Sequence, residues 1–179
     1  MNRNYQWASV AILSALNVTF TRPPFAAVAP LLPHLGFGKR YIEPCAGDGA
    51  LIRHLDHEHT CVEASDIEPR RPNFRTYDAC TEKFDDYTFD CFVTNPPWDR
   101  KLLHPIILNL SAQAPTWLLF DADWMHTRQS ATFIPLLRKI VSVGRVKWIP
   151  DSKMTGKDNC CWYLFDAAST GEPVFYGRD

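Results

Sequence analysis

Seven short apolar segments alternate with amphipathic ones along the chain. Each contains β-branched or aromatic residues, which favours a buried strand. The segments span 40–42, 59–66, 76–80, 89–94, 116–120, 141–149 and 161–165. Because strands that alternate with helices pair in parallel through crossover connections, this order predicts an α/β fold: a mostly parallel seven-stranded sheet with helices on both faces. The polar segment 150–159 joins the last two strands and predicts a terminal antiparallel hairpin.

Apolar residues at helical spacing predict the helices between these strands. The expected helices span 4–16, 24–35, 50–55, 100–110 and 129–140. Pro30 and Pro33 interrupt the second helix, and Asp99 is a suitable N-cap for the fourth. The tail 167–179 carries Gly, Pro and Ser, and is predicted to be poorly ordered and flexible.

The segment 89–94 ends in Asn95-Pro96-Pro97-Trp98. Proline has no N–H for the strand ladder, so the chain must leave the sheet at Asn95, at the edge where open α/β sheets bind ligands. The Asn95 side-chain oxygen and the Pro96 carbonyl suit a planar amino group that donates two hydrogen bonds. Trp98 offers a flat face to a heteroaromatic ring. The plainer alternative is a Pro-Pro loop with Trp98 as a core anchor.

A second informative segment runs from Glu43 to Gly49, between a predicted strand and a predicted helix. Gly47 and Gly49 allow the backbone to approach a ligand closely. The loop lacks the third glycine of a dinucleotide fingerprint, and no Gly-Lys-Ser/Thr follows as in a phosphate-binding loop. The segment therefore predicts a different kind of nucleoside ligand.

An acid ends the next strand. The Asp66 carboxylate is positioned to accept both hydroxyls of a ribose, as acids do after the second strand of nucleotide-binding α/β folds. Glu63, earlier on the strand, and Glu68, if the strand ends later, are the alternatives. After the fifth strand, the segment 121–126 either lines a substrate pocket or places Trp124 in the core with Asp123 as a helix cap.

Asn95-Pro96-Pro97-Trp98 resembles the catalytic motif of the amino-methyltransferases, which methylate exocyclic amines with S-adenosylmethionine. The closest resemblance is to the DNA adenine-N6 branch, and related RNA and protein-glutamine methyltransferases carry similar tetrapeptides. Glu-Pro-x-x-Gly-x-Gly at 43–49 is similar to the cofactor loop of class I methyltransferases. Together these resemblances, which extend over 20–165, imply a single Rossmann-like methyltransferase domain across 1–179, with N-terminal helices in 1–36 covering the cofactor site.

The resemblance also implies residue roles. Glu43 would face the amino group and sulfonium of the cofactor, and Asp78 would meet its adenine amino group, unless Asp78 is a helix N-cap. Thr21 belongs to a turn that loosely resembles one covering the cofactor. The implied cofactor-binding residues are Thr21, Glu43, Pro44, Cys45, Ala46, Gly47, Gly49, Asp66, Ile67, Asp78, Ala79 and Asn95. The implied catalytic residues are Asn95, Pro96, Pro97 and Trp98, and no metal is expected.

The net charge and the cysteine content limit the kinds of partner and the cellular compartment that we expect. The formal net charge is −1, so contact with nucleic acid would require a local basic face. Candidates are the run 70–75 and the lysines Lys153 and Lys157, each with an ordinary solvated surface as the alternative. The sequence has no apolar run of membrane-spanning length and no signal-peptide pattern. The six cysteines form no C-x-x-C pair, which disfavours zinc and indicates a reducing cytoplasm.

The sequence thus predicts transfer of a methyl group from S-adenosylmethionine to adenine N6 in DNA. The alternatives are an adenine or guanine amine in RNA, a protein glutamine, or a cofactor-binding partner subunit without activity. The compact size resembles small phage-encoded methyltransferases, for which the cytoplasm would be that of the host. No separate target-recognition domain is predicted, and the sequence does not predict an oligomeric state.

Overall fold

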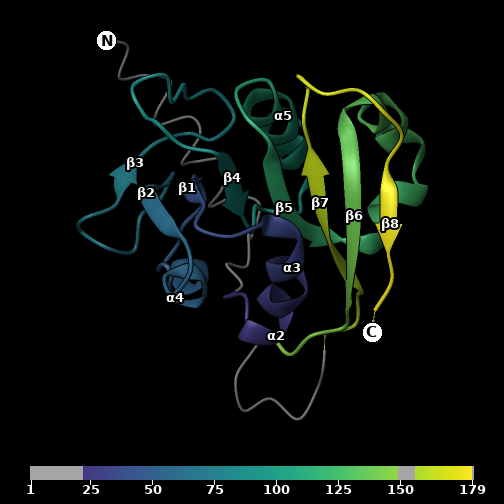
Figure 1. The fold of residues 1–179 in the computed structure, drawn as a ribbon, viewed down its shortest axis with the longest axis horizontal. Helices are drawn as coiled ribbons and strands as arrows, with labels where there is room; N and C mark the ends of the chain where they lie inside the picture. The colour runs from purple at the N-terminus through teal and green to yellow at the C-terminus, as the bar shows by residue number, and fades with distance from the viewer. Residues whose placement is uncertain (1–21, 149–155, 179) are drawn as a thin grey trace.

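The computed structural model describes residues 22–148 and 156–178 (Figure 1). The helix predicted over 4–16, Thr21 and Lys153 lie outside these ranges. Within these ranges, one eight-stranded sheet has the strand order β3-β2-β1-β4-β5-β7-β6-β8. Its strands are β1 (Arg40–Glu43), β2 (Thr60–Asp66), β3 (Arg75–Thr76), β4 (Cys91–Thr94), β5 (Thr116–Asp121), β6 (Leu137–Gly144), β7 (Cys160–Phe165) and β8 (Val174–Tyr176).

The sheet is mostly parallel. β1 pairs in parallel with β2 and β4, and β3 and β5 extend this parallel set on either side. β7 lies antiparallel between β5 and β6, so β6 and β7 form the predicted terminal hairpin. The predicted α/β fold is confirmed, with one strand more than expected, because β8 adds to the sheet beside β6.

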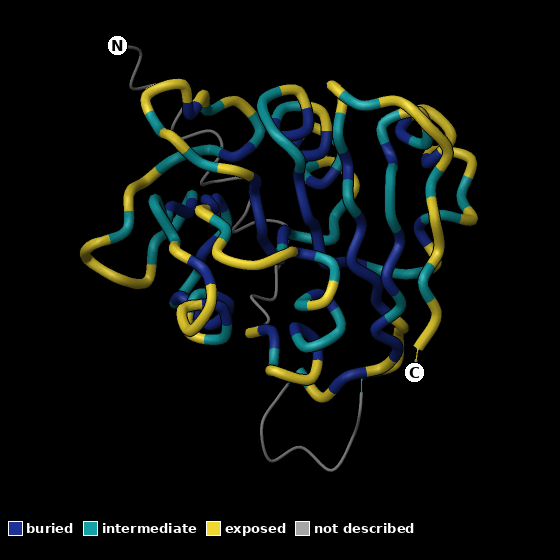
Figure 2. The backbone as a smooth tube through the Cα atoms, in the orientation of Figure 1, coloured by how far each residue is buried: buried dark blue, intermediate teal, exposed yellow. Residues whose placement is uncertain are grey.

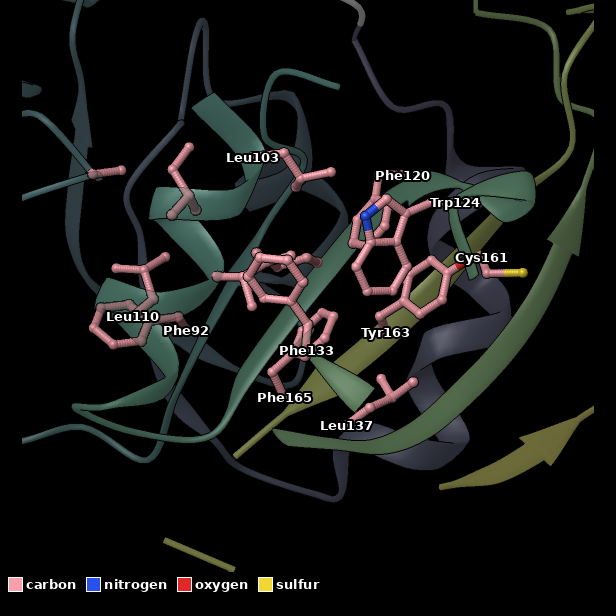
Figure 3. Close-up of a cluster of buried hydrophobic side chains, with 14 of the residues drawn as sticks. Phe92, Leu103, Leu110, Phe120, Trp124, Phe133, Leu137, Cys161, Tyr163 and Phe165 are labelled. Atoms are coloured by element: carbon pink, nitrogen blue, oxygen red, sulfur yellow. The ribbon is translucent and has the colours of Figure 1, made fainter. Parts of the chain in front are cut away.

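Helices cover both faces of the sheet, and a separate core cluster lies under each set. The first cluster packs against α5 (Arg100–Ser111) and includes Phe92, Leu103 and Phe120 (Figure 3). The second packs against the short helices α2 (Phe25–Val28), η1 (Ala29–Leu31), α3 (Leu32–Leu35) and α4 (Ala50–Leu55). The central strands β4 and β5 are buried along almost their whole length (Figure 2).

The helix predicted over 24–35 is present in three short pieces. Pro30 stands in the first turn of η1 and Pro33 in the first turn of α3. A proline has no N–H to donate but is tolerated in a first turn, so each proline begins a new piece. Within the described ranges, no helix has the length and apolar character needed to cross a membrane.

The helix predicted over 129–140 is wrong. The segment forms the 3-10 helices η3 (Arg128–Thr132) and η4 (Ile134–Leu136), and Leu137 already begins β6. The register of β6 against β7 shifts between Leu137 and Lys139. This irregularity interrupts the two-residue period of a strand, so Leu137 and Ile140 join the same core cluster at a spacing of three that mimics a helix.

The tail over 167–179 also differs from the prediction. Val174–Tyr176 forms β8, which pairs in parallel with β6, and the Tyr176 ring lies 4.3 Å from the His34 ring between centroids. Both partners are distant in the sequence. The composition of the tail contains no sign of them, which is why it predicts flexibility.

Candidate active site

The loop after β1 is shaped by two glycines in the left-handed region, with φ of +52° at Gly47 and +77° at Gly49. Gly49 is the residue before α4, and its amide donates to the Ala46 carbonyl at 2.7 Å. A Cβ at Gly49 would stand 3.0 Å from the Phe74 ring, whereas a Cβ at Gly47 would meet no atom within 4 Å. Gly49 therefore serves close packing inside the protein, and Gly47 leaves open space.

Glu43 ends β1 and is almost fully buried, with 2% of its surface exposed. Its Oε2 atom has no hydrogen-bond partner among the described residues. Burial, followed by the neighbouring carboxylates of Asp66 and Asp48, raises the pKa of Glu43 well above its ordinary value. A buried acceptor without a partner is costly, so this position suits a ligand that brings a positive charge or an N–H group.

Asp66 is the last residue of β2, and its carboxylate is tied to two loops. One oxygen accepts from the Gly47 amide at 2.8 Å and the other from the Glu68 amide at 2.9 Å. A carboxylate offers about four acceptor positions, so both oxygens retain capacity for further donors. Asp78 accepts from the Cys80 amide at 2.9 Å, in a turn that does not continue as a helix.

The Asn95-Pro96-Pro97-Trp98 corner begins where β4 ends, at the buried Thr94. The Trp98 indole N–H donates to the Leu119 carbonyl on β5 at 3.2 Å. Its ring meets that of Trp148 edge to face, at 5.6 Å between centroids and 82°. Trp98 packs against both core clusters. The corner is consequently fixed from both faces of the sheet.

One cavity of about 450 Å³ brings the glycine loop and this corner together. Among the predicted site residues, those lining it are Glu43, Pro44, Cys45, Ala46, Gly47, Asp66, Ile67, Asp78, Ala79, Asn95, Pro96, Pro97 and Trp98. Gly49 is not in the lining, and a Cβ added at Gly49 would face the Phe74 ring; its contact with the cofactor stays a prediction. Thr21 lies outside the described residues.

The cavity also has walls that the motifs do not reveal. Cys80, Leu102 and Ile106 contribute from one side, and Trp148 and Gly156 from the segments between β6 and β7. Burial raises the pKa of Cys45 well above its ordinary value and that of Cys80 to about 12, so both thiols stay protonated at neutral pH. The sequence does not mark apolar side chains as part of a cavity lining. An aromatic residue beside a polar loop, such as Trp148, is the one signal that could indicate a wall of the cavity.

Gly156 fits tightly beside Trp148. Its amide donates to the Val146 carbonyl at 2.9 Å, and a Cβ at Gly156 would approach the Trp148 ring to 3.0 Å. The Trp148 ring is thus bordered by Gly156 and by the edge-to-face contact with Trp98. This arrangement gives the cavity a second aromatic wall.

The segment 121–126 forms the 3-10 helix η2 (Ala122–His126) and is not part of the cavity lining. Trp124 is buried in the first core cluster, and its N–H donates to His104 Nε2 at 3.1 Å. Burial lowers the pKa of His104, which favours the neutral ring that can accept this bond. Of the two alternatives, the core position of Trp124 is confirmed, but Asp121 rather than Asp123 caps the helix.

The described N-terminal end lies against the glycine loop. Arg22 forms an ion pair with Asp48 at 2.8 Å, and both residues line the cavity. The Pro23 carbonyl is 3.2 Å from His54 Nε2 on α4. Among the described residues, no group of three or more His, Cys, Asp or Glu side chains is arranged to hold a metal ion.

No protein-family model matches this chain, and a search of curated proteins finds no significant match. Solved structures do resemble it. A dimethyladenosine transferase from Plasmodium falciparum is 18% identical with a TM-score of 0.56, over 82% of this chain and 62% of that one. A putative RNA methyltransferase from Pyrococcus horikoshii is 14% identical with a TM-score of 0.56, over 88% of each chain.

A third similar structure is a putative class I S-adenosylmethionine-dependent methyltransferase from Listeria monocytogenes, 9% identical with a TM-score of 0.56, over 95% of this chain and 71% of that one. Identities this low show the fold alone. This chain therefore has the Rossmann-like α/β fold found in class I methyltransferases.

Proposed function

We propose that this chain is an S-adenosylmethionine-dependent methyltransferase that acts on an exocyclic amine, most specifically N6 of adenine in DNA. The observation that carries the proposal is the shared cavity. The glycine loop after β1 and the Asn95-Pro96-Pro97-Trp98 corner after β4 both line it, as a donor site and an acceptor site for a methyl group must.

The chain's own residues fit the cofactor. The buried Glu43 carboxylate, which has an oxygen without a partner, would accept from the amino group of the cofactor and oppose its positive sulfur. Gly47 leaves space for close passage of the ligand. Asp66 would accept from the ribose hydroxyls with the capacity left on its two oxygens, and Asp78 would accept from the adenine amino group.

At the other end of the cavity, the corner would orient the target amine. The Asn95 side-chain oxygen and the Pro96 carbonyl would accept its two hydrogens, which frees the nitrogen lone pair for attack, while Trp98 and Trp148 offer aromatic surface to the base. The cofactor, when bound, supplies an electrophilic methyl group. The nitrogen–carbon bond would form as the sulfur–carbon bond of the bound cofactor breaks, and the methylated amine would then release a proton to water. Positioning supplies the catalysis, and no covalent enzyme intermediate is required.

DNA is the first choice of target because Asn-Pro-Pro followed by an aromatic residue most resembles the DNA adenine-N6 branch. In duplex DNA the base would have to leave the helix to reach the corner. RNA is the second candidate, favoured by the structural similarity to a dimethyladenosine transferase and a putative RNA methyltransferase. Both targets present the same amine to the same residues.

The test is Asn95→Ala. This variant should lose methyl transfer while cofactor affinity changes much less, because Glu43, Asp66 and Asp78 would still hold the cofactor. Isothermal titration with S-adenosylmethionine and a tritiated-methyl assay on genomic DNA measure the two effects separately. Asn73→Ala, on an exposed loop outside the cavity lining, is the matched control and should retain both. Unchanged turnover in Asn95→Ala would contradict the proposal.

A second measurement identifies the acceptor. DNA, RNA and a protein lysate are incubated with labelled cofactor, and modified nucleosides or residues are identified by mass spectrometry. N6-methyladenine in DNA is the expected product, methyladenine in RNA would support the second candidate, and methylglutamine would contradict both. A protein that binds the cofactor but methylates nothing would be a partner subunit without activity.

A further inference from the structure

The charges of this chain are unevenly distributed over the sheet, although its formal net charge is only −1. Loops that follow parallel strands meet at one edge, and loops that precede them meet at the other. The edge that precedes the strands is acidic. Its exposed or half-buried acids are Asp56, Glu58, Glu82, Asp85, Asp86, Asp90, Asp166 and Glu172, against the bases Lys39, Arg40, Lys83 and Arg138.

The edge that follows the strands carries the cavity and is rich in exposed basic side chains. Those beside the corner form two groups, and we name them by position. The α5 group is Arg100, Lys101 and Arg128; the hairpin group is Arg145, Lys147 and Lys157. None of these six side chains forms an ion pair with another residue of the described ranges, so their charges face solvent.

Several acids on the same edge are already engaged. Asp99 accepts from the Lys101 amide at 2.8 Å, and Asp121 accepts from the Asp123 amide at 3.0 Å, each as a helix cap. Asp48 is surrounded by arginines, with Arg22 at 2.8 Å. Of these acids, only the charge of Asp48 is paired with arginines, whereas Asp99, Asp121, Asp123 and Asp158 offset part of the charge of the two basic groups.

The two groups lie on different faces of the sheet, with the corner between them. α5 packs on the first core cluster, whereas Trp148, between Lys147 and the hairpin turn, packs on the second. Trp98 contacts both clusters. Leu102 of α5 and Lys157 of the hairpin group line the same cavity as Trp98, so a strand that contacts both groups would pass beside the cavity.

We propose that a nucleic-acid strand crosses the edge of the sheet along this line, with phosphates on one side of the target base held by the α5 group and phosphates on the other side held by the hairpin group. The inference rests on the proposed function and deepens it by placing the substrate path. Regularly spaced negative charges suit two separated basic groups, and the acidic opposite edge would repel the same strand and orient its approach.

The experiment measures how affinity for a fluorescein-labelled DNA duplex, and for its single strand, depends on salt concentration. Arg100→Gln with Lys101→Gln tests the α5 group, and Arg145→Gln with Lys147→Gln tests the hairpin group. The salt slope is the steepness with which the logarithm of affinity falls with the logarithm of salt concentration. Each lost phosphate contact lowers this slope by about 0.7 to 0.9. Each double substitution should therefore lower it by about 1.4 to 1.8 and weaken binding about 15- to 30-fold near 0.15 M salt. Affinity for S-adenosylmethionine should not change.

The matched control is Lys39→Gln with Lys83→Gln, which removes the same charge from the opposite edge and should leave the slope unchanged. Asp123→Lys, which adds a positive charge near the α5 group, should steepen the slope and provides a test that does not depend on loss of binding. The proposed path would be wrong if the control changed the salt slope as much as either test pair does. It would also be wrong if either test pair kept the salt slope of the wild type.

These results are separable from failure of the proposed function. If the protein methylates DNA but the pairs behave like the wild type, the path is wrong and the function stands. If the wild type binds S-adenosylmethionine but neither binds nor methylates nucleic acid, the proposed function fails, and the path fails with it.

Discussion

Replacing Gly47 or Gly49 by alanine should have different consequences, although the two glycines share a loop and a positive φ. At Gly49 the new Cβ would stand 3.0 Å from the Phe74 ring, and at Gly47 it would meet no atom within 4 Å. The left-handed backbone costs about 1–2 kcal/mol for a non-glycine residue. The lower entropy of alanine in the unfolded chain offsets about 0.4–1 kcal/mol of this.

These terms give a net loss of about 1 kcal/mol for Gly47→Ala, and a larger loss of about 2 kcal/mol for Gly49→Ala, because Phe74 must shift. For a chain of this size each kcal/mol corresponds to about 2–4 °C in Tm. Gly47 lines the cavity and Gly49 does not. Gly47→Ala should therefore weaken S-adenosylmethionine binding more than tenfold, a loss of more than about 1.4 kcal/mol, while Gly49→Ala mainly lowers Tm.

Gly38→Ala is the control. Gly38 has φ of +64° and open space around its Cβ position, as Gly47 does, but it is exposed and outside the cavity lining. It should reproduce the small loss in Tm of Gly47→Ala without the loss in binding. Thermal unfolding followed by circular dichroism and calorimetric titration of the cofactor provide the two readouts. Equal binding losses at Gly47 and Gly49 would refute the division of roles.

Two further substitutions test the ends of the cavity. Because burial and nearby carboxylates raise the pKa of Glu43, the folded state holds its proton more tightly than the unfolded state does, and the free energy of unfolding falls as pH rises from the ordinary glutamate pKa through the raised one. Glu43→Gln should remove this decline, giving a higher Tm than the wild type at neutral pH without cofactor; parallel Tm–pH curves would contradict this. Trp98→Phe loses the hydrogen bond to Leu119 and should destabilise the fold by about 1–3 kcal/mol in urea unfolding, yet keep methyl transfer within a few fold. Loss of transfer would mean that the hydrogen bond to Leu119, and not the ring face alone, is needed to position the corner.

The sequence predicts those parts of the fold whose signals are local. The glycine loop and the Asn95 corner each follow a buried strand, and parallel strands bring their carboxyl ends to one edge, so both motifs are expected at that edge. That they share a cavity depends also on the pairing of β1 with β4. The N-cap at Asp99 is equally local, since its side chain accepts from the amide two residues later. These predictions need only the strand order and the identity of a few residues.

Other parts depend on contacts that a single sequence does not display. The irregular register near Leu137 converts a strand into a pattern with helical spacing, and β8 depends on its pairing with β6 and on the His34 ring. The packing role of Gly49 is set by Phe74, which lies in another loop. In each case the local structure depends on a residue far along the chain, and neither secondary-structure propensity nor hydrophobic periodicity indicates that contact.

Trp98 packs against both core clusters, and its indole N–H donates a hydrogen bond to Leu119 on β5. The position of the corner that would hold the amine consequently depends on the packing of both core clusters. Looser packing in either core cluster would increase the mobility of Asn95 through Trp98, and tighter packing would reduce it. Adaptation of this protein to heat or cold would therefore act on the positioning of the amine even through substitutions far from the cavity.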